Sequence, residues 1–363
     1  MNQRSTRRRL PRHHAGGADP ASSWKLWPLT PCPRRSLVAA LVVAFASVAA
    51  APLAAQNSSP VSVGGVVFAQ YAGQLGAGTN SNFDVTRALV NILGKFSDGI
   101  ATRLAGDVYQ TADGSHTYRL KYAFLNWTPS GSALTYRFGL LTTPWIDWEE
   151  ALWDYRMQGP TALDRNHYLS PADFGVGVDG TINHEMVNFQ VSAVDGAGYG
   201  AKPGDQHKAY AGRVSLRLLP TDDSGRAGGL RLTGYAQLGA PTGGGTRQRL
   251  LGMASYRSKA LVLAGEYAAT TDSAVGTAKL NGTVVSVYGT FRLPSSPASI
   301  IARVDLVDPN TGVASDKTTD LIAGVSYQLS PNVRLLADVD NLSYESSGAK
   351  AITQALFQVQ FIF

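Results

Sequence analysis

Residues that could carry out catalysis or bind a metal are sparse in this sequence. The pair His184-Glu185 lacks the second histidine that a helical zinc site requires. The glycine run 243–245 is followed by Thr246 and has no lysine to hold a phosphate. Ser170 and His167 form a local serine–histidine pair, and nucleophilic catalysis needs such groups held together by the fold. We therefore expect no catalytic, metal or cofactor site, and keep a hydrolase that uses Ser170 as an alternative.

Basic side chains are the more informative chemical groups, because many of them alternate with apolar neighbours. On a β-strand this arrangement puts the basic side chains on one face and the apolar side chains on the other. A wall of cationic groups can orient anions and screen ions in a water-filled pore; the plainer interpretation is an interior that is simply wet. The basic residues in this pattern are Arg87, Arg103, Arg119, Lys121, Arg137, Arg213, Arg217, Arg231, Arg249, Arg303 and Arg334.

One long segment, residues 142–173, carries charge of the opposite sign. At about 30 residues it is longer than an ordinary hairpin connection, and loops of that length are usually functional. It also holds aromatic side chains, which favour at least partial burial: Trp145, Trp148, Trp153 and Tyr155. Its charged residues include the acids Asp147, Glu149, Glu150, Asp154 and Asp164 and the bases Arg156 and Arg165.

The elements that must position these residues are β-strands. Apolar and polar residues alternate over residues 187–193, 230–238, 300–306 and 333–340, and a period of two is typical of strands with one apolar and one wetter face. Short and long polar connections alternate between such stretches, as in a transmembrane barrel with tight turns at one end and longer loops at the other. We count about sixteen strands, with fourteen or eighteen as alternatives. They start near residues 61, 83, 100, 117, 133, 173, 186, 208, 229, 247, 260, 280, 298, 319, 333 and 351.

The last residues, 355–363, form a strand that ends on an aromatic side chain. Phe357, Val359, Phe361 and Phe363 share one face of it. A free strand on an open sheet would be an aggregation hazard, and closure against the first strand removes that edge. The strand is similar to the C-terminal sorting strand of outer-membrane proteins, so we expect Phe363 to be a sorting signal for the barrel-assembly machinery. The predicted fold class is all-β: a transmembrane antiparallel β-barrel.

The first 55 residues have the order of a secretory signal peptide. Arg34 and Arg35 precede an apolar run over residues 37–51, and small residues stand before Gln56. The run is short for a membrane-spanning helix, which needs about 20 residues; a short anchoring helix is the alternative. We expect residues 1–55 to be a cleaved signal peptide with a long basic n-region, and residues 56–363 to be the barrel. Cys32, the one cysteine of the sequence, would leave with the signal peptide.

The formal net charge of +6 belongs to this leader. Residues 1–55 hold eight of the 32 basic and one of the 26 acidic residues, which leaves 24 basic and 25 acidic residues in the rest of the chain. The rest is therefore close to neutral, and its charge gives no support for nucleic-acid binding. The charged share of 16% is also low compared with about 25% in soluble proteins.

Several stretches of the sequence resemble the phosphate-selective porin (porin O and P) family. They are an early strand with an Arg-Ala pair, a strand ending in a Thr-Pro-aromatic corner, a glycine-rich strand and a late strand, at Phe83–Ala88, Tyr136–Trp145, Phe174–Gly180 and Arg303–Asn310. The resemblance implies a sixteen-stranded, homotrimeric channel. Trp145 stands where the family more often has Phe, and Thr86 where it has Arg. The arginine-rich loops behind phosphate selectivity are not evident in the sequence, so phosphate specificity is not carried over.

These observations predict a passive outer-membrane porin for small hydrophilic solutes or ions, including anions such as phosphate. We expect export through the general secretory pathway to the outer membrane of a Gram-negative-type cell, in contact with lipid and lipopolysaccharide. We expect segment 142–173 to fold inward and narrow the pore, with its acids opposite Arg103, Arg119 and Arg137; packing outward, against a neighbouring subunit or on the rim, is the alternative. For the whole protein, the alternatives are a lipid hydrolase built into the barrel and a non-conducting structural barrel.

Overall fold

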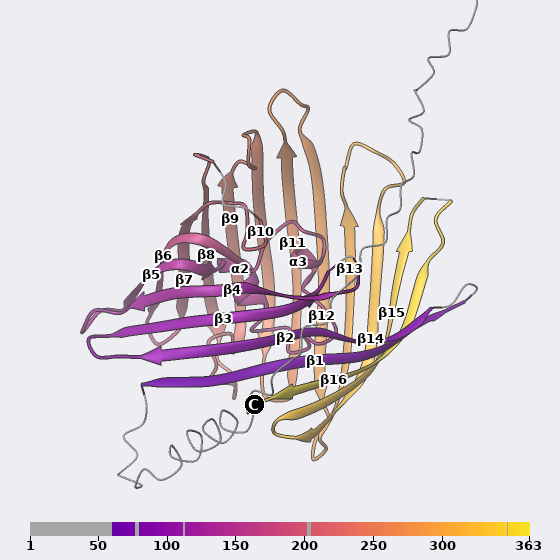
Figure 1. The fold of residues 1–363 in the computed structure, drawn as a ribbon, viewed down its shortest axis with the longest axis horizontal. Helices are drawn as coiled ribbons and strands as arrows, with labels where there is room; N and C mark the ends of the chain where they lie inside the picture. Colours follow the sequence, from indigo (N-terminus) through magenta and orange to yellow (C-terminus); the bar gives the residue numbers. More distant parts are fainter. Residues whose placement is uncertain (1–59, 77–79, 112, 202–204, 347) are drawn as a thin grey trace, which may run out of the picture. The chain divides into compact units, whose positions relative to one another are not determined.

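The computed structural model describes residues 60–76, 80–111, 113–201, 205–346 and 348–363. They form sixteen antiparallel strands that pair in sequence order into one closed barrel (Figure 1). The expected signal peptide, residues 1–55, lies outside the described residues. The strands are β1 (Val61–Leu75), β2 (Ser81–Lys95), β3 (Ile100–Gln110), β4 (His116–Trp127), β5 (Leu134–Thr142), β6 (Ala172–Ile182), β7 (Val187–Val194), β8 (Ala209–Leu219), β9 (Gly229–Gly239), β10 (Thr246–Arg257), β11 (Leu261–Ser273), β12 (Leu280–Arg292), β13 (Ala298–Asp308), β14 (Thr318–Ser330), β15 (Val333–Tyr344) and β16 (Ile352–Ile362).

The predicted fold class and the count of sixteen strands are confirmed. Every observed strand begins within about two residues of its predicted start, because the alternation of side chains persists to the last paired residue of each strand. The last strand closes the barrel as expected: β16 pairs antiparallel with β1, with Phe361 opposite Val67. Past the strand end, the Gly65 amide donates to the Phe363 carbonyl oxygen over 2.9 Å.

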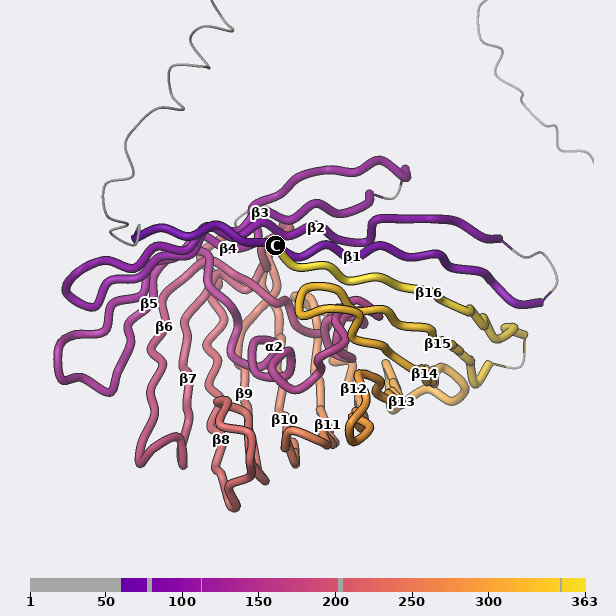
Figure 2. The backbone as a smooth tube through the Cα atoms, turned by 90° about the horizontal axis from the view of Figure 1, so that it is seen from below, coloured from indigo at the N-terminus to yellow at the C-terminus, as the bar shows by residue number. Residues whose placement is uncertain are grey.

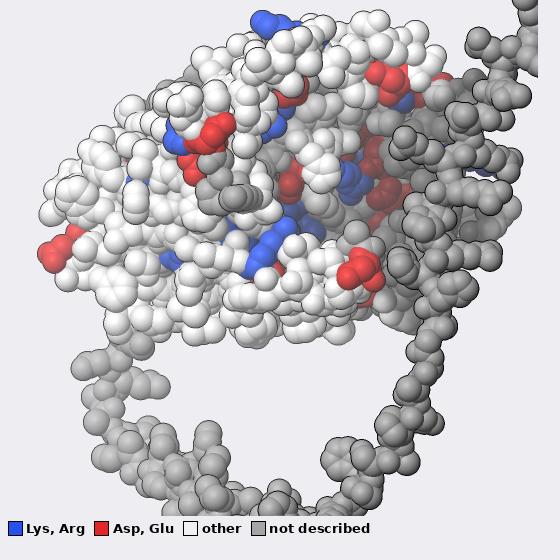
Figure 3. All heavy atoms as spheres, turned by 45° about the horizontal axis from the view of Figure 1, so that its top comes forward, with Lys and Arg blue, Asp and Glu red and all other residues white. Residues whose placement is uncertain are grey.

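The barrel is polar inside and apolar outside. On β13, Ile300 and Leu306 are exposed on the outer face, whereas Arg303 and Asp305 are fully buried on the inner face. The view in Figure 3 shows Lys, Arg, Asp and Glu side chains gathered in the hollow of the barrel, while the visible outer wall is almost free of them. Such a surface suits a lipid environment, in which exposed apolar side chains need no cover and exposed charges are costly. Within the described ranges, no helix is long and apolar enough to cross a membrane.

The connection between β5 and β6 contains two short helices that the sequence pattern did not indicate. They are α2 (Pro144–Glu149) and α3 (Ala162–Arg165). Thr143 is the N-cap of α2, and Pro144 follows at the first helical position, where the missing amide and fixed φ of proline fit a helix start. Both views of the backbone place α2 within the ring of strands (Figures 1 and 2). Residues 143–171 are called the inner segment below.

An apolar core fastens the inner segment to one side of the barrel wall. Trp145, Trp153 and Leu163 are fully buried, and they belong to one cluster with inward-facing side chains of β11, β12 and β13, among them Val262 and Ile301. The Trp153 ring meets the Tyr288 ring edge-on, with centroids 5.5 Å apart. Fully burying a large apolar side chain contributes about 1.5–3 kcal/mol, so several such rings hold this side of the segment firmly.

Candidate functional site

Basic side chains cover the opposite side of the barrel interior, on β2, β3 and β4. We call Arg87, Arg103, Arg119 and Lys121 the basic wall. Two of its guanidinium groups share one carboxylate: Asp107 of β3 is fully buried and lies 3.2 Å from Arg87 Nε and 3.5 Å from Arg119 Nη2. One carboxylate cannot neutralise two guanidinium groups, so this pair of arginines leaves a positive charge directed at the interior.

Aromatic rings hold the arginines of the basic wall in place. The Arg119 guanidinium lies between the rings of Tyr109 and Tyr199, at 3.7 Å and 4.4 Å from their centroids. Arg103 lies 4.3 Å from the Tyr122 ring centroid and donates to the Asn91 side-chain oxygen over 2.9 Å. Cation–π contacts of this kind are worth about 0.5–2 kcal/mol each. They fix the direction of the charges without neutralising them.

Glu150 presents a negative charge to the basic wall from the inner segment. Its carboxylate lies 2.9 Å from Arg156 Nη2, and the same nitrogen lies 3.4 Å from Asp164. Burial alone would raise the pKa of Glu150, but Arg156, Lys121 and Arg87 outweigh it and hold the pKa below its usual range. Glu150 is therefore ionised at neutral pH. The inner segment and the basic wall face each other with opposite charge, as in the constriction of a charged pore.

Glu149, the preceding residue, is in the opposite environment. Its side chain is only 1% exposed, and the groups that act on it are Arg303, Thr161 and Glu266 on the apolar-core side. Burial raises its pKa to about 7. Both acids were predicted to lie at the constriction; in the structure Glu150 faces the basic wall, whereas Glu149 faces the apolar core on the opposite side.

Two further acids of the inner segment pair with arginines that the sequence did not single out. Asp147 lies 2.7 Å from Arg226 Nη1, and Asp154 lies 3.1 Å from Arg257 Nη1 and is also paired with Arg292. Arg226 lies in the connection between β8 and β9, and the other two arginines are the last residues of β10 and β12.

Asp147 and Asp154 therefore do not lie opposite Arg103, Arg119 and Arg137, where the acids of the segment were expected. The aromatic rings of the inner segment pack against β11 to β13, and this packing carries Asp154 toward the ends of β10 and β12. Arg137 pairs instead with Asp179 of β6, over 3.2 Å. Strand periodicity could not signal Arg226, which lies outside any strand, or the two arginines at strand ends.

Several predicted pore-lining arginines hold the inner segment instead of facing a free passage. Arg213 lies 4.1 Å from the Trp148 ring centroid and donates to the Pro144 carbonyl oxygen, while Arg249 donates to the Tyr168 carbonyl oxygen. Arg303 and Arg334 likewise donate to carbonyl oxygens of the segment, those of Pro160 and Asp154. Arg165 of the segment pairs in turn with Asp320 and Asp340 of the wall.

The remaining two predicted arginines bond to backbone outside the inner segment. Arg217 donates to the His184 carbonyl oxygen, and Arg231 donates to those of Gly228 and Glu185.

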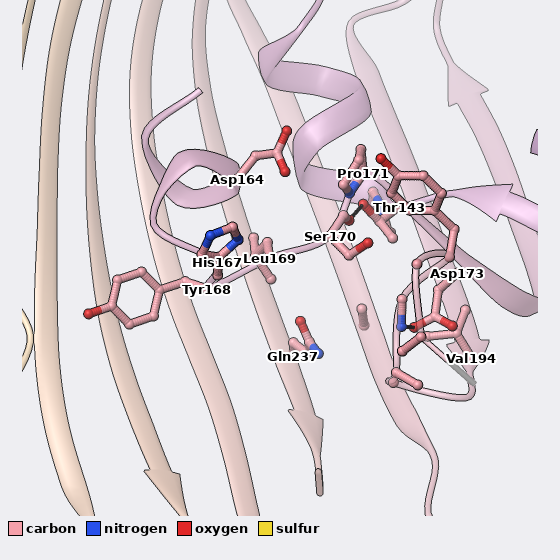
Figure 4. Close-up of a pocket in the computed structure, with 18 of the residues that line it drawn as sticks. Thr143, Asp164, His167, Tyr168, Leu169, Ser170, Pro171, Asp173, Val194 and Gln237 are labelled. Atoms are coloured by element: carbon pink, nitrogen blue, oxygen red, sulfur yellow. Dashed lines mark hydrogen bonds between the residues drawn. The ribbon is translucent and has the colours of Figure 1, made fainter. Parts of the chain in front are cut away.

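A cavity of about 540 Å³ lies between the inner segment and the basic wall. Arg87, Arg119 and Asp164 line it together with the residues of Figure 4, which shows the part of the segment near Ser170 and Asp173. Its mixture of charged, aromatic and small side chains suits passage of hydrated solutes better than tight binding of an apolar ligand, because ligand pockets are mostly apolar.

The serine–histidine pair of the sequence also lies at this cavity. The Ser170 hydroxyl donates to the Ala172 carbonyl oxygen over 2.9 Å and is not directed at His167. Among the residues that the structure describes, no group of three or more His, Cys, Asp or Glu side chains could hold a metal ion.

Comparison with known proteins agrees with the fold. No family model matches the sequence, and no curated protein matches it. Among solved structures, the anion-selective porin from Comamonas acidovorans matches with a TM-score of 0.62 and 12% identity, over 84% of this chain and 99% of its own. OmpT of Vibrio cholerae, an outer membrane protein in its trimer form, matches with a TM-score of 0.60 and 14% identity, over 84% and 99% of the two chains.

A mutant of the Rh. blastica porin is a third structural match, with a TM-score of 0.54 and 15% identity over 84% of this chain and 100% of its own. At these identities the likeness shows the fold alone. The barrel has the fold of these porin structures, and the predicted porin resemblance holds at the level of the fold. The finer resemblance to the phosphate-selective family has no support from these matches.

Proposed function

We propose that this protein is a passive channel of the bacterial outer membrane for small hydrophilic solutes or ions. The observation that carries the proposal is the cavity inside a closed, outwardly apolar barrel, lined by Arg87 and Arg119 of the basic wall and by Asp164 of the inner segment. Glu150 of the same segment also faces Arg87 and Lys121. Opposite charges across a narrow passage orient dipolar solutes and decide which ions pass. Inorganic anions such as phosphate are candidate solutes, supported by the two guanidinium groups that share Asp107.

The direct experiment is conductance in a planar bilayer. Purified, refolded protein should give stepwise, ohmic current increments in a simple salt solution. A correctly folded barrel that gives no increments would contradict the proposal and favour a non-conducting structural barrel. Release of fatty acid from phospholipid, lost on Ser170→Ala, would favour the hydrolase.

The cellular setting follows from the same proposal. The protein would be exported through the general secretory pathway with residues 1–55 removed, inserted by the barrel-assembly machinery, and embedded in lipid and lipopolysaccharide. A homotrimer is supported by the structural match to OmpT of Vibrio cholerae, which was solved in a trimer form. N-terminal sequencing of protein from outer membranes should find Gln56 at or near the start; an intact Met1 would contradict the cleavage.

Phe363 would act as the sorting signal of the last strand. Its ring is largely exposed on the outer face, whereas its backbone bonds to Gly65. Deleting Phe363 should lower outer-membrane levels and leave protein in the periplasm. Unchanged levels of heat-modifiable barrel in the outer membrane would show that the residue has no role in sorting.

A further inference from the structure

Two buried carboxyl groups lie where α2 meets the barrel wall, close enough to each other for a side-chain hydrogen bond. Glu149 of the inner segment is 1% exposed and Glu266 of β11 is 3% exposed. Glu266 accepts a hydrogen bond from Trp145 Nε1 at 3.1 Å on one oxygen. Neither oxygen of Glu149, nor the second oxygen of Glu266, accepts a hydrogen bond from any residue in the described part of the chain. These buried acceptor atoms lie in a closed site.

The guanidinium group that faces this pair already donates its hydrogen bonds to other acceptors. Arg303 of β13 donates through Nε and Nη2 to the Asp305 carboxylate and through Nη1 to the Pro160 carbonyl oxygen over 2.8 Å. Asp305 itself adds a negative charge to the site. From β12, the Tyr288 hydroxyl also lies in the site, and it has no hydrogen-bond partner among the described residues. One guanidinium group therefore stands against three carboxyl groups.

Such a site cannot hold both glutamates as carboxylates. An unpaired ionised carboxylate in an apolar interior is so costly that the group takes up a proton instead, and two carboxylates that share one site cannot both be ionised. A protonated carboxyl group also provides a donor between the two glutamates, since its O–H can donate to the other carboxyl oxygen. Protonation thus solves both the charge problem and the hydrogen-bond problem of the site.

We propose that Glu149 and Glu266 are joined by a protonated carboxyl–carboxyl hydrogen bond that fastens α2 to β11 and thereby positions Glu150 at the constriction. Glu149 acts through its neighbour: it is a positioning residue and does not touch the passage. The fastening itself does not depend on the protein being a channel, whereas its effect on Glu150 rests on the proposed function.

The fastening should weaken as the pH rises. Burial raises the pKa of Glu149 to about 7, with Arg303 opposing the shift. A carboxyl group whose pKa is raised in the folded state stabilises that state fully at low pH, and the contribution is lost as the pH rises through the raised value. For one proton, the docking equilibrium should shift on the order of tenfold for each pH unit between the ordinary glutamate value of 4.5 and about 7, and should stay level above 7.

Hydrogen–deuterium exchange of the intact barrel in detergent tests the proposal. Amide protection of residues 144–165, corrected for the intrinsic pH dependence of exchange, should fall between pH 5 and pH 7 in the natural protein and level off above pH 7. In the double variant E149Q/E266Q it should stay constant, because two amides can bond to each other without a charge. The matched control is Glu345→Gln in the exposed connection before β16, which should behave as the natural protein does.

Two results would overturn the proposal: constant protection of the natural protein from pH 5 to pH 7, or the same loss of protection in the double variant. The pH series on the natural protein alone remains decisive if the double variant does not fold. The hydrogen–deuterium exchange measurement does not depend on whether the barrel conducts ions. A protein that conducts without the pH effect would refute the fastening alone, and a protein that shows the effect without conducting would refute the channel alone.

Discussion

Glu149 and Glu150 are consecutive residues with the same side chain and contrasting surroundings. Glu149 points to the apolar core between the inner segment and β11, where its pKa is raised to about 7. Glu150 points to the basic wall and is held ionised by Arg156, Lys121 and Arg87. The inner segment thus has two faces. We call the side with Glu149, which packs against the apolar core, the docking face, and the side with Glu150, which lies opposite the basic wall, the passage face. An acidic residue of the inner segment therefore adds charge to the passage only if it lies on the passage face.

The largest expected effect follows from breaking the docking face. Trp153→Ala removes a ring that is 1% exposed and contacts Tyr288, and truncations of this kind cost about 3–5 kcal/mol. Because the ring joins the segment to the wall, the segment should lose its fixed position while the barrel stays closed. Single channels should then be larger and noisier. Trp127→Ala is the matched control, since Trp127 is 47% exposed on the outer face. Unchanged conductance in the Trp153 variant would contradict a docked segment that narrows the passage.

The next effect concerns the passage face. Glu150→Gln removes an ionised group beside Arg87 and Lys121, so reversal potentials in a salt gradient should move toward anion selectivity. A charge in a hydrated passage is worth about 0.5–1 kcal/mol per ion, or about a two- to fivefold change in the permeability ratio. Glu149→Gln at pH 6 should leave selectivity unchanged, because that carboxyl group is protonated there. Equal shifts in the two variants would remove the distinction between the faces.

A smaller effect of opposite sign is expected on the basic wall. Arg87→Gln removes one of the two guanidinium groups that share Asp107, so selectivity should move toward cations. The change should be smaller than for Glu150, because Arg119 then neutralises Asp107 and Lys121 remains. Arg231→Gln is the matched control, since Arg231 bonds to backbone carbonyl oxygens. If Arg231→Gln shifts the reversal potential as strongly as Arg87→Gln, the basic wall has no special place in selectivity.

The fold was predictable from the sequence because a barrel strand repeats the same two-residue pattern along its whole length. β13 shows this directly: Ile300, Arg303 and Leu306 alternate in the sequence as they do between the two faces. The same reasoning places Arg87 and Arg119 on the inner face, where they meet at Asp107. Periodicity is sufficient where the backbone is extended and paired on both sides.

The inner segment was not predictable in the same way. Its direction is set by rings that meet partners far away in the sequence, such as Trp153 with Tyr288 and Trp145 with Glu266. No local pattern distinguishes Glu149 from Glu150. Glu266 was also missed, because one acidic residue on the wet face of a strand has the appearance of an ordinary lumen residue. It gains its role only through Trp145 and Glu149, which approach it from the other side.

The most direct test of the two-faced segment is the accessibility of single cysteines at its two acidic positions. The sequence has one cysteine, Cys32, so protein lacking residues 1–55 offers a background without thiols. Glu150→Cys and Glu149→Cys channels in a planar bilayer would each be exposed to a small, negatively charged methanethiosulfonate reagent at pH 7. The account predicts a stepwise fall in conductance for Glu150→Cys and no change for Glu149→Cys. Modification of both positions, or block at position 149 alone, would contradict it.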